Sequence, residues 1–252
     1  MNLFLHQLRG EQRLYWRSRE LAFFTFLFPI VLFILLGSVY GNDRIKSEHN
    51  VKSSSYLLAG VLGYGVASTA FAGLAIVLVL RRESGILKRL RATPLPPAVY
   101  LAGVIASTVL VFAVEAAALI VLARVMFDVP FPEHWASVIL SLLLGALSFA
   151  ALGIALSGVI RSGEGSSAVV NAIYLPVLFL SGAFFPVHGL PEFLQWFADA
   201  LPLTHLLDAM RAVFIHGGIG RDELQGLLVV VLWGVGGAVV ALRTFRWEPF
   251  GG

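Results

Sequence analysis

Residues 81–97 read RRESGILKRLRATPLPP and form a strongly basic segment between two long apolar runs. Five cationic side chains fall between Arg81 and Arg91. Charge of this density does not belong in hydrocarbon, whereas Lys and Arg accumulate on the cytoplasmic side of membrane spans. We therefore predict that the segment joins two membrane-spanning helices in the cytoplasm, where a cytosolic protein could bind it.

The composition is that of a membrane protein. Hydrophobic residues make up 58% of the 252 residues and charged residues only 13%, against about 45–50% and about 25% in soluble domains. The apolar residues gather in runs of about 20, the length at which a helix crosses roughly 30 Å of hydrocarbon. We predict an all-α integral membrane protein, whose net charge of +3 comes from cytoplasmic loops and not from a nucleic-acid-binding face.

Two segments outside the long apolar runs are also predicted to be helical. Residues 1–20 mix apolar and aromatic residues with arginine, which favours a helix lying in the membrane interface, with a solvated basic tail as the alternative. Residues 188–215 are too polar to span and too apolar for an ordinary loop, so we expect two short external helices that re-enter one leaflet.

The whole chain, residues 1–252, is predicted to be one membrane domain with six spans. With the N-terminus inside, roughly two thirds of the 18 Lys and Arg residues are cytoplasmic, which predicts cytoplasmic termini and a cell-membrane location. Spans one and two lie in residues 21–80, spans three to five in 98–187 and span six in 224–243, the individual spans being about 21–40, 55–80, 98–123, 136–160, 166–186 and 224–242.

Motifs for chemistry are scarce. The sequence has no Gly-x-x-x-x-Gly-Lys-Ser/Thr loop, so the chain is not expected to hold ATP and Mg²⁺ itself. The six histidines lack the i, i+4 pairing of a metal site, and the absence of cysteine excludes disulfides and thiolate sites. We predict no catalytic residue, no metal and no cofactor in this chain.

Glu115 is the one clear ionisable residue near the middle of a predicted span. A lone carboxyl group there is costly and should face the bundle interior. Two interpretations remain open: a polar contact in a substrate path or between helices, and a neutral structural glutamic acid. Two rival functions also depend on Glu115, namely a gradient-driven transporter and an intramembrane enzyme acting on lipids, the latter with His188 and His205.

Three segments, in this order, resemble the membrane permeases of ABC-2 type exporters. In residues 82–95 an acidic residue and a glycine precede a basic helix that ends at Thr-Pro. Residues 180–186 read LSGAFFP and are followed by Leu190-Pro191, and residues 202–211 read PLTHLLDAMR, with His205 where the family favours an aromatic residue. With the six-span plan, the resemblance covers nearly the whole chain.

The resemblance implies the membrane-spanning subunit of an ATP-driven exporter, with an N-terminal interfacial helix, a cytoplasmic coupling helix and two short external re-entrant helices. Two such permeases, identical or closely related, would pair in the lipid. Each would bind a separate ATPase subunit, which would hold the ATP and Mg²⁺. The expected cargo is hydrophobic or amphipathic: a drug, a lipid or a lipid-linked glycan.

The resemblance also assigns residue roles. For the basic segment, a topology signal that binds anionic lipid is the alternative, although it would not require the acidic residue, the glycine or the paired prolines. The aromatic exit candidates could equally form an interfacial belt. The coupling positions implied by the resemblance are Arg82, Glu83, Gly85, Lys88, Arg89, Leu90, Thr93 and Pro94. The pathway or exit candidates, which we infer from the residues themselves, are Glu115, Phe184, Phe185, Trp196 and His205.

Overall fold

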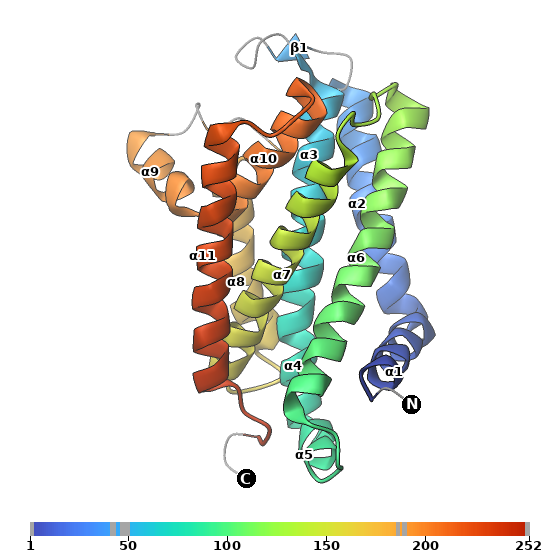
Figure 1. Cartoon of the computed structure of the whole chain (residues 1–252), viewed down its shortest axis with the longest axis vertical. Helices are drawn as coiled ribbons and strands as arrows, with labels where there is room; N and C mark the ends of the chain where they lie inside the picture. The colour runs from blue at the N-terminus through green and yellow to red at the C-terminus, as the bar shows by residue number, and fades with distance from the viewer. Residues whose placement is uncertain (1–2, 41–43, 46–50, 185–186, 188–190, 250–252) are drawn as a thin grey trace.

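The fold is a bundle of long helices that run side by side (Figure 1). The structure, a computed structural model, describes residues 3–40, 44–45, 51–184, 187 and 191–249. At one end, here called the hairpin end, strands β1 (Arg44–Ile45) and β2 (Val51–Lys52) pair antiparallel. The sequence predicted no strand here. The opposite end carries the short helix α5 (Ile86–Arg91) and is called the α5 end.

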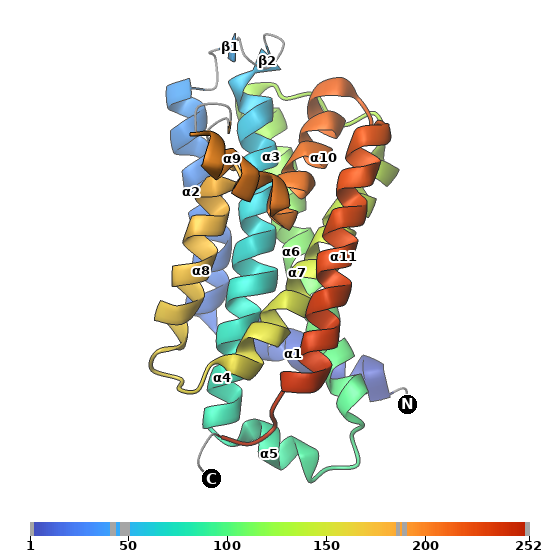
Figure 2. The same cartoon turned by 90° about the vertical axis from the view of Figure 1, so that its left-hand side faces the viewer.

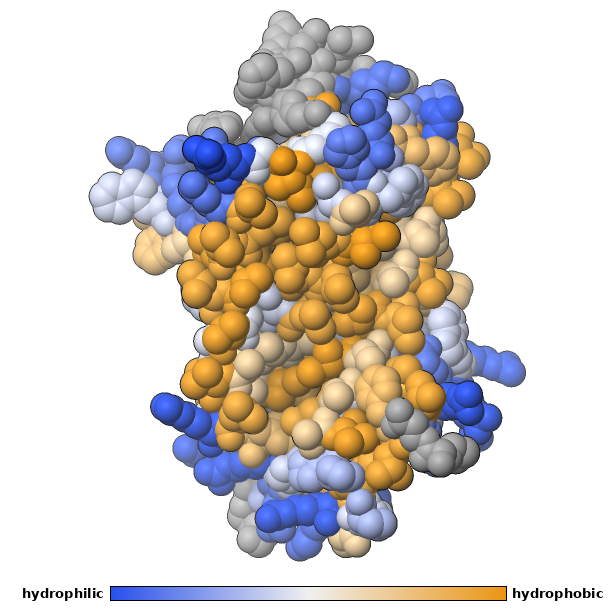
Figure 3. Space-filling model, in the orientation of Figure 1, coloured by the Kyte–Doolittle hydropathy of each residue, from blue (hydrophilic) through white to orange (hydrophobic). Residues whose placement is uncertain are grey.

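Among the described residues, five helices are long and apolar enough to cross a membrane. Their surface matches that role, because the face shown in Figure 3 has an apolar band between two hydrophilic ends. Large apolar side chains such as Leu232 and Leu242 are exposed, which is stable only against an apolar solvent. The five are α2 (Arg19–Tyr40), the continuous helix Ser53–Glu83, α6 (Pro97–Phe127), α7 (Trp135–Val159) and α11 (Arg221–Thr244).

The fifth predicted span, residues 166–186, is shorter than the sequence indicated. Helix α8 (Ser166–Leu180) has 15 residues, about 22 Å of rise against roughly 30 Å of hydrocarbon. The chain leaves the helix there because Gly182 adopts a left-handed backbone, with φ of 74°, which glycine accepts without Cβ strain.

Polar partners hold this turn after α8. The carbonyl oxygen of Gly182 accepts hydrogen bonds from the Tyr56 hydroxyl, at 3.2 Å, and from the Arg211 guanidinium. The guanidinium carbon of Arg211 also lies 4.0 Å from the centre of the Tyr56 ring, close enough for a cation–π interaction. These contacts join three elements at the hairpin end: the start of helix Ser53–Glu83, the end of α8, and the helix Pro202–His216 that carries Arg211.

The continuous helix Ser53–Glu83 changes geometry midway. Helix α3 (Ser53–Gly65) passes into the π-helical segment η1 (Val66–Gly73) and then into α4 (Leu74–Glu83). Such π-helical turns are rare and frequently mark functional sites. Segment η1 packs against α6, α7 and α8, so any molecule bound beside it lies near the middle of the bundle.

The short helices agree with the segments in which the sequence placed them. Helix α1 (Leu3–Arg17) crosses the bundle near the α5 end, and α9 (Glu192–Ala200) projects sideways near the hairpin end (Figures 1 and 2). Helix α10 (Pro202–His216) follows α9 after a single intervening residue and packs against α3, α7 and α11. The segment 188–215 therefore contains two short helices, as predicted.

Candidate functional site

Helix α5 owes its short length to residues at its two ends. Gly85 precedes it with φ of 69°, a conformation in which any residue with a Cβ is strained. After its last residue, the Thr93 hydroxyl donates a hydrogen bond of 2.6 Å to the carbonyl oxygen of Leu90, and Pro94 cannot continue a helix. Glycine at the start and Thr-Pro at the end thus delimit a helix of six residues.

Helix α5 presents cations outward from an apolar anchor. Leu87 is fully buried and Leu90 half-buried. Lys88, Arg89 and Arg91 are all exposed. The helix is therefore fixed to the bundle on one side and offers a cationic surface on the other.

Arg82 lies apart from this exposed surface, although the sequence grouped it with the coupling residues. Helix α4 continues to Glu83, past the predicted boundary at residue 81, and the Arg82 side chain is buried. Its guanidinium donates hydrogen bonds to the carbonyl oxygens of Ser157, at 2.7 Å, and Ile160 at the end of α7. Carbonyl groups at a helix C-terminus lack intrahelical partners and favour a cation, so Arg82 ties α4 to α7.

Arg81 makes a buried ion pair with α1. Its Nη1 and Nη2 atoms donate to the two carboxylate oxygens of Glu11 at 3.0 and 2.7 Å, a bidentate arrangement. Nη1 also donates to the Tyr100 hydroxyl at 3.0 Å, and the Gln7 amide donates to Glu11 at 2.8 Å. The side chains of Glu11 and Arg81 are 7% and 18% exposed. This cluster, here called the Glu11–Arg81 clamp, joins α1, α4 and α6.

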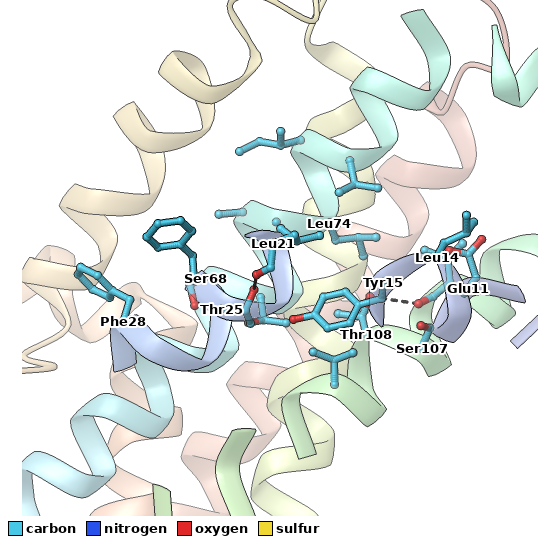
Figure 4. A pocket seen from close by; sticks show the side chains of 18 of the residues that line it. Glu11, Leu14, Tyr15, Leu21, Thr25, Phe28, Ser68, Leu74, Ser107 and Thr108 are labelled. Carbon is cyan, nitrogen blue, oxygen red and sulfur yellow. Dashed lines mark hydrogen bonds between the residues drawn. The ribbon is translucent and has the colours of Figure 1, made fainter. Parts of the chain in front are cut away.

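A cavity of about 490 Å³ lies beside the clamp (Figure 4). Residues of α1, α2, α3, η1, α4, α6 and α8 line it, and most of the wall is apolar or aromatic. The volume falls within the range of about 300–1,000 Å³ that is typical of small-molecule sites. Hydroxyl and amide groups interrupt the apolar wall at Thr25, Ser68, Thr69, Ser107, Thr108 and Asn171.

The cavity has little net charge. Within the described part of the chain, Glu11 and Arg81 are the charged side chains of its lining, and they neutralise each other. Burial raises the pKa of the Tyr15 hydroxyl above its ordinary value, so this lining residue stays neutral at physiological pH. The cavity therefore combines apolar surface with uncharged hydrogen-bonding groups.

Glu115 lies behind the cavity wall, in the bundle interior where the sequence placed it. Its side chain is buried, and Thr69, a lining residue of η1, donates a hydrogen bond of 3.1 Å to its carboxyl group. A Cβ added to Gly65 would lie 2.7 Å from the other carboxyl oxygen, so glycine at 65 makes room for this side chain. The geometry fits a contact between helices, and a part in the cargo path stays a prediction.

The structure describes three of the other exit candidates. Trp196 is exposed on α9, and the His205 ring nitrogen Nε2 lies 2.9 Å from the carbonyl oxygen of Asp199. Phe184 is partly buried, with its ring centre 6.4 Å from that of Tyr64. Phe185 and His188 lie outside the described residues.

Sequence reasoning missed the cavity hydroxyls. A single Ser or Thr in an apolar helix carries no signal, because most such residues bond to their own backbone. Only the packing of α2, η1 and α6 brings these groups to one cavity. The amide of Asn171 within the apolar run of α8 is a polar signal that sequence reasoning did not use.

Replacing Glu115 by glutamine should leave the fold intact. The amide oxygen can still accept the hydrogen bond from Thr69, so the expected loss is below about 1 kcal/mol, whereas Glu115→Leu would leave the Thr69 hydroxyl without this acceptor and cost more. Thermal unfolding of the purified protein measures both variants. A glutamine variant that unfolds like the leucine variant would show that the carboxyl group itself is required.

Comparison with known proteins gives consistent results. The profile of the family described as ABC-2 type transporter matches residues 2–215. The inner membrane transport permease YadH of Escherichia coli (strain K12) is 26% identical over 220 residues, which cover 82% of each chain. The putative transport permease YvfS of Bacillus subtilis (strain 168) is 23% identical over 206 residues, 81% of this chain and 82% of that protein. ABC transporter G family member 20 of Dictyostelium discoideum is 28% identical over 198 residues, 78% of this chain and 26% of that protein.

Proposed function

The chain belongs to the ABC-2 type transporter family, and from this premise we propose that it forms the cargo pathway of an ATP-driven exporter. Members of the family are non-catalytic membrane permeases, and two of the relatives above, YadH and YvfS, are described as a transport permease and a putative transport permease. The proposal adds the direction of transport, the surface that receives the ATPase and the class of cargo.

The observation that carries the proposal is the geometry of α5. Its cations Lys88, Arg89 and Arg91 are exposed while Leu87 anchors it in the bundle. A docking element needs such a combination, because it must bind a soluble partner and still transmit force to the spans. We propose that the ATPase subunit binds α5 together with exposed Glu83, and that Gly85, Leu90, Thr93 and Pro94 set the shape and position of this helix.

Movement of α5 would reach the bundle through the two arginines before it. Arg82 is bonded to the end of α7, and Arg81 is bonded to Glu11 of α1. We propose a positioning role for Arg82 in place of direct contact with the ATPase, since its guanidinium is occupied inside the protein. Docking at α5 would in this way act on α1 and α7 together.

The proposed topology places the α5 end in the cytoplasm. Helix α8 then completes the six spans as the fifth in chain order, α1 lies in the inner interface, and α9 and α10 re-enter the outer leaflet. The exposed cations of α5 support this orientation, because Lys and Arg accumulate on the cytoplasmic side. We also propose pairing with a second permease, identical or closely related, on the ground of the family membership.

The proposed cargo is hydrophobic or amphipathic: a drug, a lipid or a lipid-linked glycan. The cavity supports this class, because its wall is mostly apolar with interspersed hydroxyl groups. The rival functions need convergent polar groups at one depth. Glu115 is bonded to Thr69 in the bundle, whereas His205 lies against Asp199 between α9 and α10, and these separate positions do not favour the rivals.

Replacing Lys88, Arg89 and Arg91 together by alanine should weaken ATPase binding about tenfold. Each exposed ion pair contributes about 0.2–1 kcal/mol, and about 1.4 kcal/mol corresponds to a tenfold change in affinity. Titration of the purified permease with the ATPase subunit that co-purifies with it measures the affinity, and cargo-stimulated ATP hydrolysis measures the coupling.

The matched control replaces Arg124 and Arg221, exposed arginines on helices that are predicted to meet the outer face. This control should bind the ATPase as the wild type does. Equal affinity of the triple variant and the control would refute the docking role of α5. Labelling that reached residues 81–97 from outside the cell would refute the topology.

A further inference from the structure

Three hydroxyl groups of the cavity, from three different helices, have already used their hydrogen atoms. Thr25 of α2 donates to the Leu21 carbonyl at 2.8 Å. Ser68 of η1 donates to Gly65 at 3.2 Å, and Thr108 of α6 donates to Val104 at 3.1 Å. A hydroxyl group has one hydrogen and two acceptor lone pairs. These three side chains, here called the acceptor triad, can therefore accept hydrogen bonds from a bound molecule (Figure 4).

Aromatic side chains form another part of the cavity wall. The ring of Tyr64 lies 5.4 Å from that of Phe28 and 6.2 Å from that of Tyr174, measured between ring centres. All three residues line the cavity. Aromatic rings attract one another at about 4.5–7 Å, so an aromatic ring in the cavity could extend this series.

The charges of the cavity are already paired. Both carboxylate oxygens of Glu11 and both terminal nitrogens of Arg81 take part in the clamp. A ligand with a net charge would find no free counter-charge among the described lining residues, and burying an unpaired charge is costly. The chemistry of the wall therefore selects an uncharged ligand.

We propose that this cavity is a binding site for an uncharged amphiphile that carries an aromatic ring and at least one hydroxyl or N–H donor. The donor bonds to the acceptor triad, and the ring packs among Phe28, Tyr64 and Tyr174. The inference deepens the proposed function. It rests on that function only where it identifies the bound molecule as the class of cargo that is loaded beside α1.

The test uses the full chain in lipid nanodiscs, without ATPase or nucleotide. The probe is hydroxymethylbenzophenone, an uncharged aromatic alcohol that crosslinks when illuminated. Carboxybenzophenone and trimethylammoniomethylbenzophenone serve as its anionic and cationic counterparts. We expect saturable labelling of peptides from α2, η1 and α6 by the alcohol, several-fold above either charged compound. Labelling by a charged compound to the same extent, or labelling confined to other helices, would overturn the proposal.

A triple variant tests the acceptor triad itself. Thr25→Val, Ser68→Ala and Thr108→Val together remove the oxygen atoms with little change in size, and labelling should fall about tenfold or more. Thr244→Val is the matched control, because Thr244 also donates to its own helix, to Val240 at 2.9 Å, but lies outside the cavity lining. Equal labelling of the triple variant and the control would overturn the proposal.

A second readout covers the case in which the triple variant does not fold. Benzyl alcohols that lack the photoactive ketone should compete with the probe and reduce labelling of the wild type in a concentration-dependent way. Failure to compete would count against the site.

The experiments distinguish failure of this site from failure of the proposed export function. Labelling of the cavity in a protein that shows no cargo-stimulated ATP hydrolysis would support the site and contradict the export function. Stimulated hydrolysis without labelling would leave the export function standing and overturn the site.

Discussion

Replacing Glu11 by leucine is expected to destabilise the permease by about 3–5 kcal/mol. Removing one partner of a buried ion pair leaves the other charge buried and uncompensated, and a loss of this size is typical. Arg81 would lose both of its bonds to the carboxylate and keep only the Tyr100 hydroxyl, while α1 would lose its tie to α4. Denaturant or thermal unfolding of the purified protein measures the loss.

A double variant separates the charge from the packing. Glu11→Leu with Arg81→Met replaces the pair by apolar side chains of similar size, which is often neutral, so most of the lost stability should return. Glu20→Leu is the control, because Glu20 is an exposed carboxylate at the start of α2. If the double variant is no more stable than Glu11→Leu, the buried charge is not the cause of the loss.

Replacing Gly60 by alanine is the second change with a large expected effect, about 3 kcal/mol. A Cβ at this position of α3 would overlap the backbone carbonyl oxygen of Ala183. Backbone atoms cannot rotate away as a flexible side chain can, and overpacking of this kind costs typically 1–3 kcal/mol, occasionally more. The displaced turn also carries Gly182, so the bonds from Tyr56 and Arg211 should weaken.

Gly236→Ala provides the comparison for this effect. Gly236 also lies within a long apolar helix, α11, but an added Cβ there would meet nothing within 4 Å. The free energy of unfolding of this variant should change by less than about 1 kcal/mol, which is the difference in helix propensity between glycine and alanine. Melting temperatures and yields of the membrane-inserted protein measure both variants. Similar losses in the two would show that close approach of α3 to the turn after α8 is unimportant.

Much of the fold could be predicted from the sequence because the determining signals are local. Each long helix follows from an apolar run of sufficient length, and five of the predicted spans have such helices. Gly85 and Thr93-Pro94 delimit α5 through backbone conformation and the missing amide hydrogen of proline. These are properties of a few neighbouring residues, so no knowledge of the tertiary structure is needed.

The site was less predictable because it depends on contacts between distant residues. Glu11 and Arg81 are separated by 70 positions. In the sequence, Glu11 only interrupts the apolar pattern of its helix, and its role becomes visible when the fold places Arg81 beside it. Arg82 is indistinguishable in sequence from the exposed cations of α5, yet the end of α7 binds it inside the bundle. The early end of α8 likewise depends on Tyr56 and Arg211, which are distant in the chain.

The consecutive positions of Arg81 and Arg82 constrain the kind of motion that α4 can transmit. Neighbouring residues of an α-helix point about 100° apart around its axis. Accordingly, one arginine leaves the helix toward α1 and the other toward α7. Translation of α4 along its axis would move both attachments in the same direction, whereas rotation about that axis would move them in directions about 100° apart. If docking at α5 rotates α4, it would therefore move α1 and α7 in different directions.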